Sequence, residues 1–382
     1  NVGIAEIGQF EFLSIAEIHN TLAYVNGRVL AEGKLNVRAY DKVDGSSELS
    51  GTTVAAVKGG VNSVTQTVSN SAKISIGKNA DIEAIDNVKL DAQAHIWLVG
   101  TTDTKNIGIL GEFSATNLNI TWTRRQNISI GDGARLASRY GNLSILCGED
   151  SDSDSTEYSD NISAKAEMDG GGIISGGNGP KAYVTIDSAT TVNVGGKAEI
   201  TALFGSLSIK TTDSASASAS AKRWMGTFAG SNKSDAQITA KSISNINLGL
   251  TQDDITLSDG ETLQDYQSYI NGKRTEIVSD IRQKLQADAH SETVSAGSKT
   301  TAISKINSMD NEQIINLNNV FVGGIDMLVI EAMTSHMENK SSAYACIKGA
   351  TGKAIAKSET RINNNDNDDA AVAQINVTSL AH

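Results

Sequence analysis

Residues 73–92 read KISIGKNADIEAIDNVKLDA, and close variants of this stretch recur along most of the 382-residue chain. Residues 127–137 repeat it as NISIGDGARLA, followed by LSILC at 143–147. Residues 191–202 repeat it again as TVNVGGKAEITA, followed by LSIKT at 207–211. Self-similarity of this kind is typical of architectures in which neighbouring copies of one unit stack on each other. The repeat therefore decides the fold class before any local motif does.

A hydrophobic residue followed by glycine marks the same point in each copy. These pairs are Ile76-Gly77, Ile130-Gly131, Val194-Gly195, Leu248-Gly249 and Val322-Gly323. Their spacings are 54, 64, 54 and 74 residues, with an earlier copy around Val25 and a weak last copy from Ile362. We infer about six degenerate copies of roughly 54–64 residues, with insertions absorbed at turns.

Within a copy, apolar residues alternate with polar ones over three short stretches. The alternating positions are Ile74 and Ile76, then Ala80, Ile82 and Ala84, then Val88, Leu90 and Ala92. Alternation with a period of two predicts strands that bury one face. We expect an all-β fold, a right-handed parallel β-helix (β-solenoid), in which each copy comprises about three coils of ~18 residues.

Composition limits the classes of partner. A net charge of −12 argues against a nucleic-acid partner or an anionic membrane surface, and no apolar run is long enough to cross a bilayer. Aromatic residues make up 4% of the chain, which suits a narrow core of Ile, Val, Leu and Ala. The chain starts at Asn1 without a methionine, and we expect it to be a piece of a longer protein.

One stretch departs from the strand pattern. Ser258 and Glu261 have the spacing of a capping box, and apolar residues then recur three and four apart. Those apolar residues are Leu263, Tyr266, Ile270, Ile277, Ile281 and Leu285. We predict a helical hairpin over roughly 259–289. The expected organisation is β-solenoid repeats over 1–251, a helical insertion over 252–312 and a β-solenoid continuation over 313–382.

The repeated phrase, hydrophobic-Gly-x-x-Ala-x-hydrophobic-x-Ala, resembles the repeats of giant bacterial surface adhesins and exoproteins of the filamentous-haemagglutinin-like and leukotoxin type. The approach Thr21-Leu-Ala23-Tyr-Val25 and the glycine-containing stretch 108–115 fit the same pattern. The resemblance covers nearly the whole chain outside the predicted helical insertion. It concerns structural residues, so it is specific for architecture rather than for a ligand.

This resemblance implies a structural or adhesive segment of a long bacterial surface or secreted fibre, located outside the cell. Its partners would be host-cell or matrix glycans or proteins, or other copies of itself, and we expect no enzymatic activity. Two other interpretations stay open. One is a self-assembling extracellular filament subunit, and the other is a carbohydrate-active β-helix enzyme.

The enzyme interpretation lacks a convincing set of residues. Asp253 and Asp254 follow Gln252 as in one element of polygalacturonases, but the companion elements are absent, and acidic residues are expected before a helix. The five histidines form no metal-type pair, and we expect no cofactor. Two acidic tracts, 149–154 and 363–369, alternate oxygen ligands as calcium sites do, but they lack the other features of known calcium loops, and we favour solvated loops.

Two aromatic residues are the candidates for contact with a ligand. Trp224 follows Lys222-Arg223 at an irregular position of the repeat, which favours exposure, and Tyr183 could join it in a surface for sugar stacking. Trp122 continues the alternation of its strand and is expected to point inward. Cys147 occupies the position of Ala92 and Thr211 in other copies, so we expect a buried free thiol.

Overall fold

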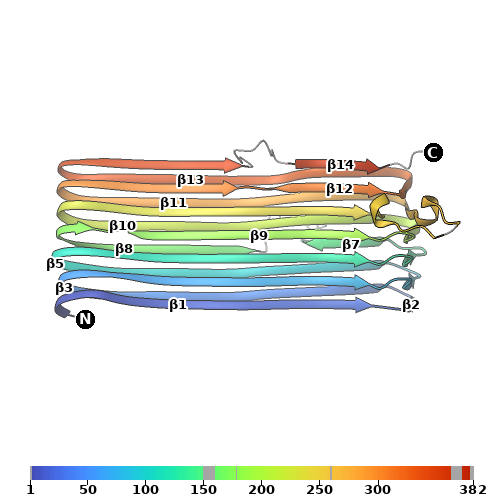
Figure 1. The fold of residues 1–382 in the computed structure, drawn as a ribbon, viewed down its shortest axis with the longest axis horizontal. Helices are drawn as coiled ribbons and strands as arrows, with labels where there is room; N and C mark the ends of the chain where they lie inside the picture. Colours follow the sequence, from blue (N-terminus) through green and yellow to red (C-terminus); the bar gives the residue numbers. More distant parts are fainter. Residues whose placement is uncertain (1, 149–159, 178, 259, 363–371, 379–382) are drawn as a thin grey trace.

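A computed structural model of the chain describes residues 2–148, 160–177, 179–258, 260–362 and 372–378. Nearly all of them are β-strand, and the strands join in one large parallel sheet. The strands are β1 (Val2–Val25), β2 (Arg28–Ala31), β3 (Leu35–Ile76), β4 (Asp81–Ala84), β5 (Val88–Ile130), β6 (Arg135–Ser138), β7 (Leu143–Gly148), β8 (Asn161–Gly176), β9 (Pro180–Val194), β10 (Glu199–Leu248), β11 (Ser268–Ser308), β12 (Glu312–Asn318), β13 (Val320–Ile362) and β14 (Val372–Thr378). Figure 1 shows the long strands stacked from β1 near one edge to β13 near the other, each bent at the same end of the molecule.

Each repeat pairs once with the next repeat. Val29 lies beside Ile82 and Val37 beside Leu90, and Ile76 lies beside Ile130. After each repeat, the chain therefore runs beside the equivalent residues of the repeat before it. Each repeat forms one layer of the stack. Our prediction of three coils of ~18 residues per repeat is wrong, because the three alternating stretches are three sides of a single layer.

The alternation itself is confirmed. All eight apolar positions predicted in the first quoted copy are at most 2% exposed, and they belong to one core cluster with their counterparts in other layers. This first core lies where β4 and β6 form short sides between the longer strands. Cys147 is buried there between its partners Ala92 and Thr211, as the repeat alignment predicts.

A second apolar core lies between the long limbs of each layer. Trp122 is fully buried in it, as its place in the alternation predicts, and its indole nitrogen donates a hydrogen bond to Asn70 Oδ1 at 2.9 Å. Small residues dominate elsewhere in this core, for example Ala217, Ala219 and Ala221 against Ala236. The two limbs can approach closely because these side chains are short.

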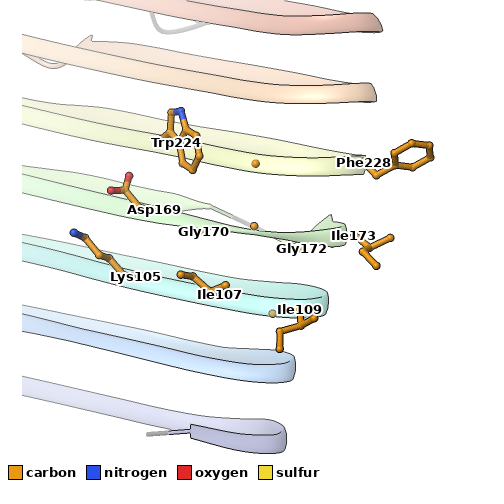
Figure 2. Close-up of a pocket in the computed structure, with 12 residues that line it drawn as sticks. Lys105, Ile107, Ile109, Asp169, Gly170, Gly172, Ile173, Trp224 and Phe228 are labelled. Atoms are coloured by element: carbon orange, nitrogen blue, oxygen red, sulfur yellow. The ribbon is translucent and has the colours of Figure 1, made fainter.

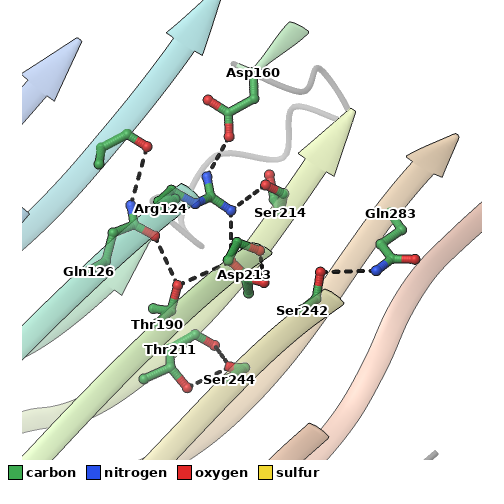
Figure 3. Close-up of polar contacts among 12 residues, drawn as sticks. Arg124, Gln126, Asp160, Thr190, Thr211, Asp213, Ser214, Ser242, Ser244 and Gln283 are labelled. Atoms are coloured by element: carbon green, nitrogen blue, oxygen red, sulfur yellow. Dashed lines mark hydrogen bonds and ion pairs between the residues drawn. The ribbon is translucent and has the colours of Figure 1, made fainter. Parts of the chain in front are cut away.

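Buried polar side chains lie along the strands between the two cores, and Figure 3 shows their contacts. Arg124 lies between two carboxylates, at 2.5 Å from Asp160 and 2.7 Å from Asp213. The next layers continue the row with hydroxyls, among them Ser244, which donates to Thr211 Oγ1. Burial of these groups is tolerated because they are hydrogen-bonded to one another.

The predicted helical hairpin is wrong. Within the described part of 252–312, two short 3-10 turns, η1 (Gln252–Asp254) and η2 (Leu263–Tyr266), precede β11. The spacing of four that joins Ile277, Ile281 and Leu285 is also a multiple of the strand period, and all three are buried, Ile277 in the first core and Leu285 in the second. Polar Ser279 and Gln283 point inward between them and disguise the alternation.

The repeat alignment also fails at its last step. Leu248 pairs with Leu317 and not with Val322, which lies beside Ile270 of β11. The marker misleads because Leu317 is followed by Asn318 and not by glycine, whereas Val322-Gly323 lies early in β13. Between β10 and β11 the chain leaves the layer at a corner that carries η1 and η2 (Figure 1). None of the helices among the described residues has the length and apolar character needed to span a membrane.

Candidate binding pocket around Trp224

Trp224 lies on the outer face of β10, near the bend of the long limbs. Its neighbours in the two preceding layers are Asp169 of β8 and, beyond it, Lys105 of β5. The residues on either side of it, Arg223 and Met225, are fully buried, while Trp224 is 44% exposed. The strand alternation therefore presents the indole outward, as its sequence position predicts.

Apolar residues at the bend extend this surface. The pairing of β5 with β8 is interrupted between Ile107 and Gly111. The pairing of β8 with β10 skips Ile173 and Phe228. The displaced side chains protrude, with Ile109 62%, Ile173 53% and Phe228 68% exposed. Figure 2 shows these three stacked at the bend and the Lys105–Asp169–Trp224 column beside them.

Together these residues line a pocket of about 610 Å³. Its floor is made of glycines, and at three of them, Gly170, Gly171 and Gly172, the neighbouring layer excludes a side chain. A Cβ at Gly171 would lie 2.1 Å from the Gly226 carbonyl oxygen, and one at Gly172 would lie 2.3 Å from that of Gly108. The glycines thus permit close contact of the layers, and the same lack of side chains leaves the space beside Trp224 open.

A buried ion pair lies beneath the pocket. Arg223 Nη2 donates to Glu112 Oε2 at 2.8 Å, and both side chains are completely buried. Glu112 also accepts a hydrogen bond from the Ser114 backbone amide at 2.9 Å. Burial raises the pKa of Glu112 and lowers that of Arg223, while the attraction between the two charges opposes both changes. The pair joins layers at the bend and holds the strand that presents Trp224.

The lining of this pocket is mainly apolar. Lys105 and Asp169 are the charged side chains that line the pocket, and the rest of the lining is apolar or glycine. Within the ranges that the structure describes, no group of three or more His, Cys, Asp or Glu side chains could hold a metal ion. An exposed indole in an apolar recess offers a stacking surface for a partner's apolar group.

Tyr183 does not belong to this pocket. It lies on β9 beside Asn119 and Gln237, on the limb that contributes Val184 to the other side of the second core. Its hydroxyl donates to Asp235 Oδ2 at 3.2 Å, and burial followed by the charge of Asp235 raises its pKa. The two predicted contact residues therefore face away from each other across the core.

The remaining sequence candidates are dispersed. Asp253 and Asp254 lie exposed on η1. The acidic tracts 149–154 and 363–369 were the calcium candidates, and both lie outside the described residues. The calcium hypothesis thus stays a prediction.

Sequence reasoning missed the apolar residues at the bend. Ile107, Ile109 and Phe113 stand close together in a stretch that we treated as a loose, glycine-containing part of the repeat. Their signal is an apolar run that breaks the alternation, which marks a place where side chains no longer divide into an inner and an outer face. Ile173 and Phe228 occupy the corresponding bends of later layers.

No protein-family model matches the chain, and neither the curated proteins nor the solved structures contain a match to it.

Proposed function

We propose that the chain is a right-handed parallel β-helix, or β-solenoid. The support for this is that successive repeats pair in parallel, one layer on the next, from β1 to β13 and β14. Right-handed connections between parallel strands are the general rule, and they are the basis for the proposed hand.

On this architecture we propose a structural and adhesive role, as an extracellular segment of a long bacterial surface or secreted fibre. The observation that carries it is the exposed Trp224 pocket on the outer surface of a continuous strand ladder. Hydrogen-bonded layers stiffen the segment, and the pocket presents an apolar contact to a host-cell or matrix protein or to the apolar face of a glycan. No catalytic step is part of this role.

A binding screen tests the proposal. The labelled chain is titrated onto host cells, matrix proteins and a polysaccharide panel, and soluble sugar products are assayed in the same wells. We expect saturable binding without product, and Trp224→Ser should weaken it about tenfold, equivalent to about 1.4 kcal/mol. The matched control is Trp97→Ser, because Trp97 is 49% exposed on β5 and does not line the pocket.

Two outcomes would overturn the adhesive role. If the chain binds nothing in the screen, the adhesive role is wrong. If the Trp97 and Trp224 variants lose binding equally, the pocket is not the contact site. Release of sugar products would favour the carbohydrate-active enzyme instead and would make Asp253 and Asp254 the first residues to substitute.

A filament subunit is the second candidate. Among the described residues, β1 pairs with β3 alone and β13 with β11 alone, so each presents one unpaired strand edge. Such edges can pair with another chain and, in a head-to-tail arrangement, produce open fibres. Concentration-dependent growth of fibres in sedimentation and electron microscopy would support this candidate.

A further inference from the structure

A second recess lies at the corner where the chain turns at the hydrophobic-Gly pairs of the repeats. The length of the limbs separates it from the Trp224 pocket. It has a volume of about 700 Å³ and is lined from Tyr24 in the first layer to Asn316 and Asn318 in the sixth. Segment 250–254 forms one wall with Leu250 and Asp254. The recess is thus a groove that crosses the layers.

The dimensions of the groove suit an extended polymer. Neighbouring strands lie about 4.8 Å apart, so the five steps from Tyr24 to Asn316 cover about 24 Å. A volume of about 700 Å³ spread over that length makes the groove long and narrow.

The floor offers neutral hydrogen-bonding groups at every layer. One row runs Tyr24, Ser75, Ser129, Asn193, Asn247 and Asn316. Asn247 Nδ2 donates to Asn193 Oδ1 at 2.8 Å, and Asn316 Nδ2 donates to Asn247 Oδ1 at 2.7 Å. Each of these amides has a second N–H that this ladder does not use.

The backbone at the corner is already engaged. Gly131 N–H donates to Ile76 O at 2.9 Å, Gly195 N–H to Ile130 O at 2.8 Å, and Gly249 N–H to Val194 O at 2.9 Å. A peptide that added itself as a strand would need such backbone groups to be unpaired. The groove instead presents hydroxyls, side-chain amides and the exposed ring of Tyr24.

The charges that line the groove also favour a neutral ligand. Lys78 is the cationic side chain lining the groove, and its ammonium is 3.9 Å from the Asp132 carboxylate. Asp254 adds an exposed carboxylate, which accepts hydrogen bonds from hydroxyls and repels polyanions. We propose that this corner groove binds a neutral linear oligosaccharide along the stack, with the apolar face of a sugar on Tyr24. The proposal rests on its own groove and not on the Trp224 pocket.

Fluorescence anisotropy with labelled sugars tests it. The probes are linear hexasaccharides of β-linked glucose, N-acetylglucosamine and mannose, with hexagalacturonate as the anionic probe and an uncharged Gly-Ser peptide of similar length. We expect at least one neutral hexasaccharide to bind saturably and its disaccharide to bind at least about tenfold more weakly, since it spans fewer layers.

Substitutions locate the binding. Ser129→Trp places a bulky side chain in the middle of the groove and should weaken binding at least about tenfold. Tyr24→Ala removes an exposed ring and should weaken it several-fold without disturbing any buried contact. Ser163→Trp is the matched control, because Ser163 is a half-buried outward serine of β8 that does not line the groove.

The Trp224→Ser variant separates this proposal from the adhesive role, since it should leave oligosaccharide binding unchanged. The proposal is overturned if no neutral hexasaccharide binds, or if hexagalacturonate or the peptide binds more tightly. It is equally overturned if Ser163→Trp reduces binding as much as Ser129→Trp does, with melting temperatures confirming that both variants fold.

Discussion

At the scale of single residues, the interior of this protein is unusual in containing fully buried charges. Arg223 and Glu112 are both completely buried, and Arg124 contacts Asp160 and Asp213 with almost no exposure. Desolvation of a charge is costly, and its partner compensates only while both are present. Each member of such a group therefore depends on the others.

Removing one member of the Glu112–Arg223 pair should be more harmful than removing both. We expect Arg223→Met to reduce the free energy of unfolding by about 3–5 kcal/mol, because Glu112 is left buried without its partner. The double variant Glu112→Leu/Arg223→Met should recover a large part of this loss. Urea unfolding measures both, and a double variant less stable than the single one would contradict the argument.

The two cysteines should differ in reactivity. Cys147 is 1% exposed in the first core, and burial raises the pKa of its thiol, so little nucleophilic thiolate forms. Cys346 is partly exposed on β13. We expect a thiol reagent to modify Cys346 rapidly in the folded protein and Cys147 only after unfolding, as mass spectrometry of digested samples would show. Rapid modification of Cys147 in the folded protein would contradict its burial.

The Glu83 carboxylate provides a pH-dependent test. A hydrogen bond from Arg135, together with the charges of Arg135 and Arg139, lowers its pKa. A carboxyl with a lowered folded-state pKa stabilises the fold above its unfolded-state pKa and loses this contribution as the pH falls through the folded-state value. NMR titration should give a low midpoint that rises in Arg135→Gln. Arg28→Gln is the control, since Arg28 pairs with Asp81, and an equal rise there would contradict the assignment.

At the scale of elements, β11 is the clearest case of a strand whose sequence resembles a helix. Ile281 and Leu285 suit both structures, but Gln283 discriminates between them. On a helix it would lie away from the apolar stripe, whereas in β11 it is completely buried and donates to Ser242 Oγ and Asn311 Oδ1.

Truncation of Gln283 therefore tests the strand. We expect Gln283→Ala to reduce stability by about 1–3 kcal/mol, because Ser242, Ser308 and Asn311 lose a buried partner. Gln286→Ala, in the outward row of the same strand, should change it by less than about 0.5 kcal/mol. Equal and small effects in chemical unfolding would favour the helical hairpin over β11.

At the scale of the whole molecule, stability should vary from layer to layer. In a stack, each layer contacts its two neighbours, and a terminal layer has one neighbour fewer. Inward-facing residues of the last layer, such as Val322 and Ile330, are partly exposed among the described residues, while their partners Ile270 and Ile277 are fully buried.

Hydrogen exchange measures this gradient. We expect the amides of β5 and of the central part of β10 to exchange most slowly, and those of β1 and β13 to exchange fastest. The same experiment after Ile209→Ala, in the middle of the stack, should raise exchange in the adjoining layers more than in the terminal ones. Uniform protection along the chain would show that the layers unfold as a single unit.

Several features of the protein were determined by the sequence alone. The alternation of Ile74, Ile76 and Ile82 indicated strands with one buried face, and alignment of the copies placed Cys147 between Ala92 and Thr211. The irregular position of Trp224 indicated its exposure. These features are local, because a strand's side chains alternate between inside and outside wherever the strand pairs.

The tertiary structure decided the rest. The period-two alternation does not reveal how many residues make up one layer. That each repeat forms a single layer is seen only in the pairing of residues such as Ile76 and Ile130. The strand β11 could not be recognised in the sequence, because polar residues occupy inward-facing positions in it. Their hydrogen-bond partners come from other layers. The Trp224 pocket and the corner groove each combine residues from several layers, and a surface of that kind exists only after the repeats have stacked.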